Sequence, residues 1–314
     1  MREGVIMKKP AVSQQVSMQN KLAYVKNNWQ LYVIFMLPAF LLTLVFKYFP
    51  MGGLIIAFQK YNSRLGILGS KFIGFDNFTR FLTSPEFPKL MGNTLKLSVF
   101  GLLWGFLPPV IIALVLSRVT GLRAKRNIQL LLYAPNFISV IVLCGMVIAF
   151  LSPVGPINAM LGLKSNLMTN PKAFRPIYIT SGIWQGAGWA SIIYTAALSG
   201  VRQDLIEACN IDGASLWQQI LNVDLPTIRP IMVVQFILSA GQIMSIGFEK
   251  ALALQTDLNR AASEIIPTYV YRLGLQIGDY GYSTAVGLFN SIINVILLLT
   301  VNAIVKRLND GEGL

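Results

Sequence analysis

The segment that decides the fold is Gln203–Pro230, which reads QDLIEACNIDGASLWQQILNVDLPTIRP. It is polar, and it lies between two stretches that contain no charged side chain, Pro176–Val201 and Ile231–Phe248. A helix needs about 20 mostly apolar residues to cross the hydrocarbon core of a bilayer. The segment is therefore predicted to connect two membrane spans.

Further charge-free stretches lie on both sides of this pair. Apolar residues make up 54% of the chain and charged residues 12%, against about 25% charged residues in an ordinary soluble domain. A soluble protein with buried helices is the alternative, and the number of such stretches argues against it. Six spans are predicted, at about Leu31–Tyr48, Leu97–Ser117, Ile128–Leu151, Ile177–Gly200, Ile231–Phe248 and Ser283–Val305.

The rest of the chain divides into loops and tails around one membrane domain, residues 30–307. Residues 1–29 are basic and polar without an apolar core, so they are predicted to be a cytoplasmic tail and not a signal peptide. The short loop Arg118–Arg126 is dense in Lys and Arg, which favours a cytoplasmic position for this loop and for both termini. Residues 308–314 then form a cytoplasmic C-terminal tail.

Proline and glycine interrupt several predicted spans. Pro38, Pro108-Pro109 and Pro135 are expected to kink their helices, because proline lacks a backbone donor. The pairs Gly101/Gly105 and Gly182/Gly186 have the spacing that permits close packing of helices in membranes.

Several function classes are disfavoured. The chain has no histidine and no Gly-x-x-x-x-Gly-Lys-Ser/Thr loop, so no cofactor is expected in this chain and ATP binding is not expected. Cys144 and Cys209 lie in unlike settings and predict neither a disulfide nor a metal site. The net charge of +13 is scattered over loops, which favours membrane lipid over nucleic acid as its partner. A membrane enzyme or a proton-coupled transporter would need carboxylates within the spans, and these are missing.

The deciding segment is predicted to form two short amphipathic helices. Asp204 followed by Glu207 resembles a capping box, and Asp212 can cap a second start at Gly213. Gly213 leaves a gap on the apolar face where another backbone could approach. Pro226 and Pro230 are expected to end the segment before the fifth span. Such a pair could dock a partner or lie on the membrane surface, and the residues alone do not decide between the two.

The segment resembles the Glu-Ala-Ala-x3-Gly-x9-Ile-x-Leu-Pro pattern of the membrane subunits of binding-protein-dependent ABC importers. Glu207, Ala208, Gly213, Leu225 and Pro226 match in register, while Cys209 and Val223 depart from the pattern with residues of similar size. The resemblance covers about residues 30–307. Asp212-Gly213-Ala214 and Pro135–Ser139 resemble the sugar-transporting branch of this family. Tyr269–Arg272, together with Tyr282 and Ala285–Leu288, resembles the polysaccharide and oligosaccharide permeases of Gram-positive bacteria.

This resemblance implies an all-α integral membrane protein with the six-span fold of a type I importer and a cytoplasmic coupling loop, residues 201–230. It implies a non-catalytic permease in a bacterial cytoplasmic membrane that passes an oligosaccharide by alternating access. Its implied partners are a second, different permease, a cytoplasmic ATPase dimer that binds ATP and Mg, and an extracellular solute-binding lipoprotein. The residues it assigns to ATPase coupling are Glu207, Ala208, Asp212, Gly213, Ala214, Leu225 and Pro226.

A sugar path needs hydrogen-bonding groups and aromatic faces inside apolar walls. Polar side chains within spans face the bundle interior, where they line a cavity or tie helices together. The candidates for the substrate path are Trp184, Gln185, Trp189, Tyr194, Gln235, Gln242, Asn290 and Asn294. An acidic saccharide is the alternative substrate, because basic residues Lys47, Lys60 and Lys96 are predicted on the outer side.

Overall fold

The computed structural model describes residues 27–160, 162, 166–241, 243 and 247–308. Nearly all of the predicted N-terminal tail and residues 309–314 of the C-terminal tail therefore lie outside the described residues. The chain divides into two compact units, residues 1–55 and 56–314, and each is described by itself.

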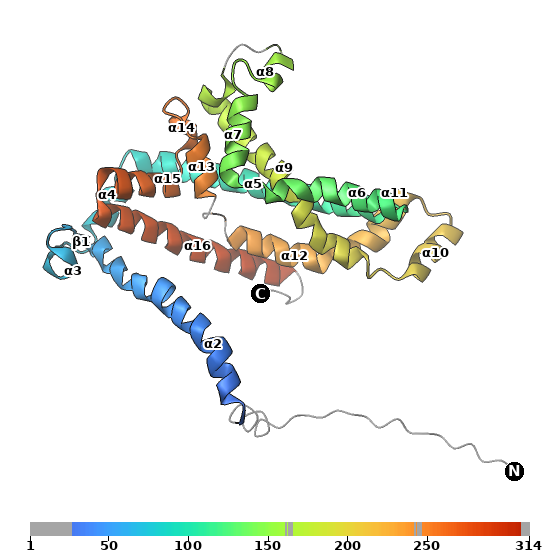
Figure 1. Ribbon diagram of the computed structural model, residues 1–314, viewed down its shortest axis with the longest axis horizontal. Helices are drawn as coiled ribbons and strands as arrows, with labels where there is room; N and C mark the ends of the chain where they lie inside the picture. The colour runs from blue at the N-terminus through green and yellow to red at the C-terminus, as the bar shows by residue number, and fades with distance from the viewer. Residues whose placement is uncertain (1–26, 161, 163–165, 242, 244–246, 309–314) are drawn as a thin grey trace. The chain divides into compact units, whose positions relative to one another are not determined.

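The described part of the first unit is one apolar helical run. It begins with α2 (Trp29–Thr43), passes through a π-helical turn (Leu44–Tyr48) and ends within a 3₁₀-helix (Phe49–Phe58), whose last three residues belong to the second unit (Figure 1). Pro38 lies inside α2. The side chains of this run are largely exposed, as expected for a helix whose contacts are lipid or another chain.

After the end of the 3₁₀-helix, the second unit continues with a small folded element in the predicted first loop. A minimal antiparallel hairpin pairs Gln59 with Phe72 and Lys60 with Lys71. The Asn77 side-chain amide ties this hairpin to the following helix by donating to the carbonyls of Ala57 (2.8 Å) and Gln59 (3.2 Å). Its elements are β1 (Gln59–Lys60), α3 (Gly66–Gly69), β2 (Lys71–Phe72) and α4 (Asp76–Leu82).

The second predicted span is a long straight element, α5 (Glu86–Ser117). It begins eleven residues before the predicted start at Leu97, and it runs through Pro108-Pro109 without a break. It packs along α9 (Pro171–Leu198), which contains the fourth predicted span except for its last two residues.

The third predicted span, Ile128–Leu151, is wrong as a single helix. It is divided between α6 (Leu122–Tyr133) and α7 (Val140–Phe150), which meet at an angle of 97°. Pro135 lies in the first part of a 3₁₀ turn (Ala134–Phe137) between them, and the Ser139 hydroxyl then caps α7 by accepting from the Val142 amide (3.3 Å). Proline and a strong N-cap together start a new helix in a new direction.

Close approach of two backbones in this bundle involves a glycine that was not predicted. Among the predicted glycines, Gly182 is close to a side chain, because a Cβ there would lie 2.9 Å from Lys250 Nζ. A Cβ on Gly101, Gly105 or Gly186 would meet nothing within 4 Å. A Cβ on Gly188 would lie 1.9 Å from the carbonyl oxygen of Leu132, so the backbones of α6 and α9 touch there. Gly188 is therefore the residue that permits this helix contact.

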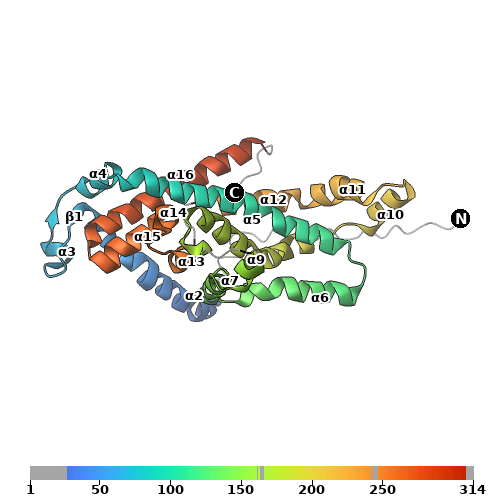
Figure 2. The ribbon, with the colours of Figure 1, turned by 90° about the horizontal axis from the view of Figure 1, so that it is seen from above.

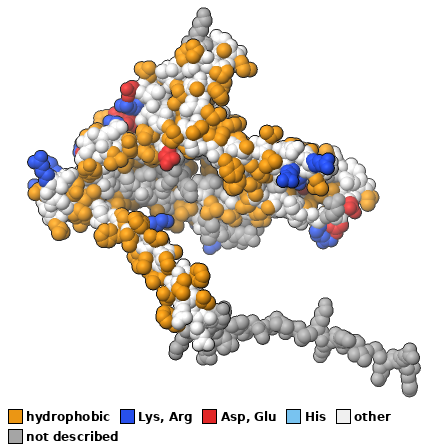
Figure 3. Space-filling view, in the orientation of Figure 1, with side chains coloured by type: hydrophobic (Ala, Val, Ile, Leu, Met, Phe, Trp, Pro, Cys, Tyr) orange, Lys and Arg blue, Asp and Glu red, His pale blue; other side chains and the backbone are white. Residues whose placement is uncertain are grey.

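The remaining helices place two connections at opposite ends of the second unit. Both views show α10 and α11 at one end and β1, α3 and α4 at the other (Figures 1 and 2). Hydrophobic side chains cover much of the face shown in Figure 3, with Lys and Arg toward these two ends. The other elements are α8 (Pro156–Met160), α10 (Gln203–Ile211), α11 (Leu216–Gln219), α12 (Leu225–Gly241), α13 (Phe248–Leu254), α14 (Arg260–Ser263), α15 (Ile266–Tyr271) and α16 (Tyr280–Leu308).

The predicted count of six spans is not confirmed by length and composition. Within the described residues four helices qualify, and the bent α6–α7 pair brings the number to at most five. α9 is long enough at 28 residues, but Gly, Ser, Thr and Gln make it less apolar than the others. The fifth span also differs from its prediction, because α12 ends at Gly241 and Phe248 begins α13.

Candidate functional site

The polar segment Gln203–Pro230 begins with α10, whose start differs from the prediction. The residue before the helix is Arg202, and no side chain caps it. Asp204 pairs instead with the Arg202 guanidinium and accepts from its neighbour's amide, Leu205 (3.1 Å). Glu207 and Ala208 are exposed on the middle of α10. The predicted capping box from Asp204 to Glu207 is therefore wrong.

Gly213 terminates α10, and a glycine suits this position because of its backbone conformation. Its φ of 69° lies in the left-handed region. The Gly213 amide donates to the Asn210 carbonyl (3.2 Å), and the Ala214 amide donates to the Cys209 carbonyl (2.9 Å). This is a Schellman ending, with Ile211 as the last helical residue and Asp212 as the C-cap. Asp212 therefore caps the C-terminus of α10. The prediction that Asp212 caps the start of the next helix is wrong.

The next helix has a complete capping box of its own. The Gln218 amide donates to the Ser215 hydroxyl (3.3 Å), and the Ser215 amide donates to the Gln218 side chain (2.7 Å). From there the chain stays helical through α11, a π-helical segment (Ile220–Asp224) and α12. The prediction that Pro226 ends the segment is wrong, because the wider π-turns just before it accommodate a residue without an amide hydrogen.

A buried ionic contact fastens this helix to the end of α5. Arg118, directly after α5, pairs with the Asp224 carboxylate, whose side chain is 3% exposed. Arg118 Nη1 also donates to Gln219 Oε1 (3.0 Å). Gln219 Nε2 in turn donates to Asn210 Oδ1 on α10 (2.8 Å) and to the Ala214 carbonyl (3.2 Å). We call Arg118, Gln219, Asn210 and Asp224 the anchor.

The anchor was not predicted from the sequence, although two of its residues carry opposite charges that could have indicated a pair. Arg118 and Asp224 are opposite charges next to charge-free stretches, about 100 residues apart. Buried charges in such a setting need a partner. The anchor makes α10, α11 and the C-terminal end of α5 one hydrogen-bonded assembly.

The outward side of this assembly is apolar. Ile211 is 87% exposed and Trp217 is 66% exposed, at the end of the unit away from α4. Large exposed apolar side chains on a connection between helices mark a surface for another molecule. We call the set the docking edge: Leu205, Ile211, Leu216, Trp217 and Leu221.

Three of the predicted substrate-path residues meet in one cavity. Trp189 and Tyr194 from α9 and Gln235 from α12 line a hollow of about 500 Å³ together with Phe106 and Pro109 of α5. An amide, a phenol and an indole within apolar walls provide the chemistry that a sugar needs. Their assignment to the substrate path stays a prediction.

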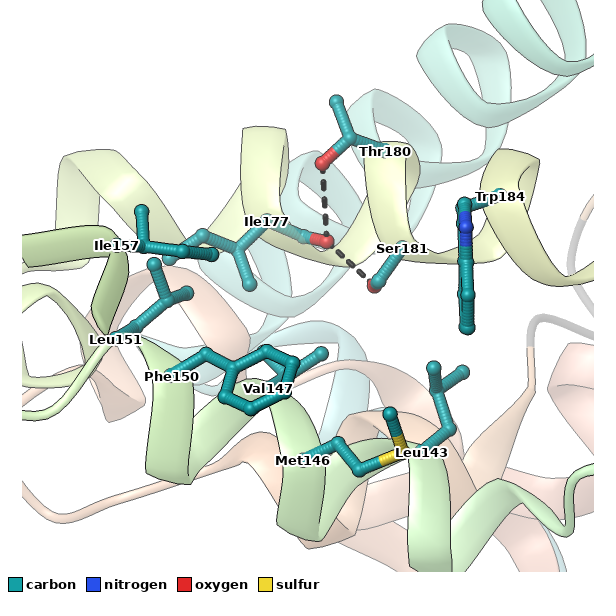
Figure 4. Close-up of a pocket in the computed structure, with 10 residues that line it drawn as sticks. All are labelled: Leu143, Met146, Val147, Phe150, Leu151, Ile157, Ile177, Thr180, Ser181 and Trp184. Carbon is teal, nitrogen blue, oxygen red and sulfur yellow. Dashed lines mark hydrogen bonds between the residues drawn. The ribbon is translucent and has the colours of Figure 1, made fainter. Parts of the chain in front are cut away.

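Trp184 lies apart from these three, in a cavity of about 390 Å³ between α7 and α9 (Figure 4). Two of the side chains that line this cavity carry hydroxyl groups. Both donate to the Ile177 carbonyl, Ser181 at 2.5 Å and Thr180 at 3.5 Å. The remaining lining is aliphatic or aromatic, so this cavity offers a sugar few hydrogen bonds. Gln185 donates to the Ile138 carbonyl (2.8 Å) and ties α9 to the turn before α7.

The other candidates on the sixth span are separate again. Asn290 lines a hollow beside α15 and α16 with Val270, Gly274 and Ser283. Asn294 follows one turn later on α16. Gln242 lies outside the described residues. The structure therefore brings together Trp189, Tyr194 and Gln235, and it does not bring Trp184 or Asn290 to them.

The connection between α12 and α16, which we call loop five, is held by buried polar groups. Asn259 is fully buried and donates to the carbonyls of Met168 (2.8 Å) and Leu254 (3.0 Å). Glu264, also buried, accepts from Arg272 Nε (2.8 Å). Lys250 donates to the Tyr178 carbonyl (2.7 Å), and its burial lowers the pKa of its ammonium to about 8.

Comparison with known proteins fits this arrangement. The family described as "Binding-protein-dependent transport system inner membrane component" matches residues 101–310. Protein LplB of Bacillus subtilis (strain 168) is 38% identical over 298 residues, which cover 93% of each chain. The polygalacturonan/rhamnogalacturonan transport system permease protein YteP of the same organism is 39% identical over 286 residues, 90% of this chain and 89% of that protein.

A solved structure is similar along nearly the whole length. It is a bacterial ABC transporter involved in the import of the acidic polysaccharide alginate, with a TM-score of 0.84 and 36% identity over 92% of this chain and 99% of that one. A second structure shows the alginate transporter in complex with an alginate pentasaccharide-bound periplasmic protein, also with a TM-score of 0.84. This chain therefore belongs to the inner membrane components of binding-protein-dependent transport systems, and it is a multi-pass cell-membrane permease.

Proposed function

We propose that this chain is one of two different permease subunits of an ATP-driven oligosaccharide importer, and that the docking edge receives a cytoplasmic ATPase. The observation that carries the proposal is the anchor beneath the docking edge. It joins α10 and α11 to the end of α5 by partly buried hydrogen bonds, while five large apolar side chains on α10, α11 and the π-helical segment are exposed. A helix packed into a groove of a partner buries just such side chains.

The anchor also gives a route for coupling. A movement imposed on α10 passes to Gln219, then to Arg118 and α5, and α5 lines the cavity with Trp189, Tyr194 and Gln235. ATP and Mg belong to the ATPase in this proposal, and this chain contributes no catalytic group. In this proposal coupling to the ATPase also involves Glu207, Ala208, Asp212, Gly213, Ala214, Leu225 and Pro226.

An acidic saccharide is the substrate class that the relatives support best. YteP is named for polygalacturonan and rhamnogalacturonan, and the solved transporter is titled for alginate. These are polymers that contain uronic acids. We propose that an extracellular solute-binding lipoprotein delivers a uronate-containing oligosaccharide to this chain and its partner permease.

The proposal is tested by purifying the chain with its co-encoded permease, ATPase and binding protein, and measuring ATP hydrolysis in proteoliposomes. Oligogalacturonate or alginate oligosaccharides should stimulate hydrolysis, and neutral maltooligosaccharides should not. Stimulation by the neutral sugars alone would contradict the acidic substrate. Full uptake without the second permease gene would contradict the pair of different subunits.

A matched pair of variants tests the docking edge. Ile211→Asp places a charge on the edge and should abolish retention of the ATPase during purification, because the partner's groove would then bury an unpaired carboxylate. Leu68→Asp is the control, since Leu68 is fully exposed in the first loop at the other end. Equal ATPase retention in both variants would move the docking surface elsewhere.

The orientation is tested by single cysteines in a background without Cys144 and Cys209. Ser63, Asn170 and Leu258 are exposed and should react with an impermeant thiol reagent from outside, whereas Ser215→Cys should be protected. Leu258 replaces its buried neighbour Asn259 as the labelling position in loop five. Labelling of Ser215→Cys alone would place the docking edge outside the cell.

A further inference from the structure

A groove between α5 and α9 has a charged end and an apolar end. It encloses about 430 Å³ and is separate from the cavity that holds Trp189 and Gln235. Its principal lining residues are Phe100, Trp104, Lys172, Arg175, Ile179 and Ile183.

The charged end carries two cations without a carboxylate. Lys172 and Arg175 lie in the first turns of α9, and no Asp or Glu lines the groove. Neither cation forms an ion pair with a carboxylate in the part of the chain that the structure describes. Arg175 Nη2 donates to Asn93 Oδ1 (2.9 Å), while its Nε is buried without a hydrogen-bond partner. This end therefore attracts an anion.

The apolar end lies further along both helices. Ile179 and Ile183 follow the cations by one and two turns of α9. On α5, Phe100 is 46% exposed and Trp104 is 61% exposed. Both rings are therefore available to an apolar molecule in the groove, and the polarity falls steadily from one end to the other.

This gradient distinguishes between possible ligands. A saccharide carries hydroxyl groups along its whole length and needs polar partners throughout. The neutral polar side chain in the groove is Thr180, and its hydroxyl already donates to the Pro176 carbonyl (2.8 Å). A phospholipid instead has one anionic group followed by an acyl chain, and basic pockets between membrane helices bind such headgroups.

We propose that this groove binds one anionic phospholipid, with its phosphate between Lys172 and Arg175 and an acyl chain along Ile179, Ile183 and Trp104. The site requires that α5 and α9 cross the membrane, as in the proposed function, and it does not require any transport activity. With the predicted orientation, the lipid belongs to the outer leaflet.

Trp104 serves as the reporter of occupancy. The purified importer complex is reconstituted with phosphatidylglycerol or phosphatidylcholine that is brominated on its acyl chains, because bromine quenches a tryptophan in contact. The Trp104 signal is the fluorescence difference between the parent complex and Trp104→Phe. Brominated phosphatidylglycerol should quench this signal at a mole fraction several-fold lower than brominated phosphatidylcholine.

Charge reversal tests the headgroup contact. Lys172→Glu should remove the preference for phosphatidylglycerol, and Lys71→Glu, which makes the same charge change at an exposed position in the first loop, should keep it. Lys172→Gln provides the same test with a smaller change if Lys172→Glu fails to assemble.

Three results would overturn the proposal. Equal quenching of Trp104 by both lipids would show that the groove does not select the headgroup. Absence of Trp104 quenching by either lipid would show that protein covers the groove, as a partner permease could. Displacement of brominated phosphatidylglycerol by a soluble uronate oligosaccharide would assign the groove to the sugar. Because none of these readouts is uptake or ATP hydrolysis, the lipid site can fail while the proposed function stands.

Discussion

Two connections of the second unit differ in which side chains they bury and which they expose. In loop five, Asn259, Glu264 and Lys250 are all buried and hydrogen-bonded within this chain. The segment from α10 to α11 buries Gln219 of the anchor, whereas the docking edge is exposed. Buried polar networks make a structure rigid when every member is satisfied. These three residues therefore fix loop five to the rest of this chain, whereas α10 and α11 would be completed by a partner in the proposed function.

The largest effect on stability is expected in loop five. Asn259→Ala removes hydrogen bonds to Met168, Leu254, Thr256 and Ser263 at a fully buried position. Leaving several buried groups unsatisfied should lower the free energy of unfolding by about 3 kcal/mol. Thermal unfolding of the purified complex, followed by tryptophan fluorescence, measures the loss.

The control for this variant lies on the other connection. Asn222→Ala removes a similar side chain that is exposed and donates to its own helix at the Gln218 carbonyl (2.9 Å). Its unfolding temperature should match that of the parent. An equal loss in both variants would mean that loop five is no more self-supporting than α10 and α11.

The anchor should give the next largest effect, and it should affect coupling as well as stability. Asp224→Ala leaves the Arg118 guanidinium buried without its carboxylate, which should cost about 2–3 kcal/mol. Substrate-stimulated ATP hydrolysis should fall further than basal hydrolysis, because Asp224 no longer holds Arg118 in place for its hydrogen bond to Gln219, which links α10 to α5. The double variant Arg118→Met/Asp224→Leu removes both charges at once.

This double variant separates the two roles of the anchor. Replacement of a buried ion pair by apolar residues of similar size can be nearly neutral for stability. If Arg118→Met/Asp224→Leu regains stability and also regains full stimulation of ATP hydrolysis, the anchor is only structural. The coupling role requires that stability returns while stimulation stays low, because the contact from Arg118 to Gln219 is still missing.

The fold was predictable from the sequence where one chemical property dominates a long stretch. Leu97–Ser117 and Ser283–Val305 lie inside α5 and α16, because a long apolar run favours one continuous helix. The break between α6 and α7 was not predicted, although Pro135 was noted, since the direction after a break depends on packing around it. The contact at Gly188 was missed for the same reason: a sequence does not tell which glycine faces another backbone.

The position of the candidate site in the chain was predictable from the sequence, but its helix ends and its hydrogen bonds were not. The matching residues from Glu207 to Pro226 located the segment, and both ends of α10 were then predicted wrongly. Local signals competed there: Asp204 prefers its neighbour Arg202, and Ser215 caps better than Asp212 because Gly213 has already turned the chain. The anchor joins residues more than 100 positions apart, which no local pattern reports.

The buried cation of loop five predicts a moderate dependence of stability on pH. The pKa of Lys250 is lowered from 10.5 to about 8 by burial, while the nearby Cys144 acts in the opposite direction. Between these values the unfolded chain binds more protons than the folded chain, so the free energy of unfolding should rise as pH increases from about 8 to 10.5. The rise should be on the order of 1–3 kcal/mol.

Lys250→Met tests this assignment, since methionine fills similar space without a charge. Chemical denaturation of the complex at pH 8 and pH 10 should give a smaller difference for Lys250→Met than for the parent. Lys71→Met, at an exposed position, should keep the parent's difference. The same pH difference in parent and Lys250→Met would place its origin in another group.

The smallest effect is expected from substitutions of Gly213. These substitutions distinguish a conformational requirement for glycine from a steric one. If the left-handed φ of 69° is the requirement, Gly213→Asn should cost only a few tenths of a kcal/mol, because asparagine adopts this conformation more readily than other residues. Gly213→Ala should then cost about 1 kcal/mol, although its side chain is smaller.

If close approach of the ATPase is the requirement, the order reverses in the assembled complex: Asn disturbs ATPase retention more than Ala. A Cβ at this position meets nothing within 4 Å in this chain, so any steric penalty comes from a partner. Comparing both variants, by unfolding and by ATPase retention, therefore separates a glycine that ends α10 from a glycine that makes room for another protein. The Schellman hydrogen bonds of Gly213 and Ala214 predict that Asn is the better tolerated of the two in both measurements.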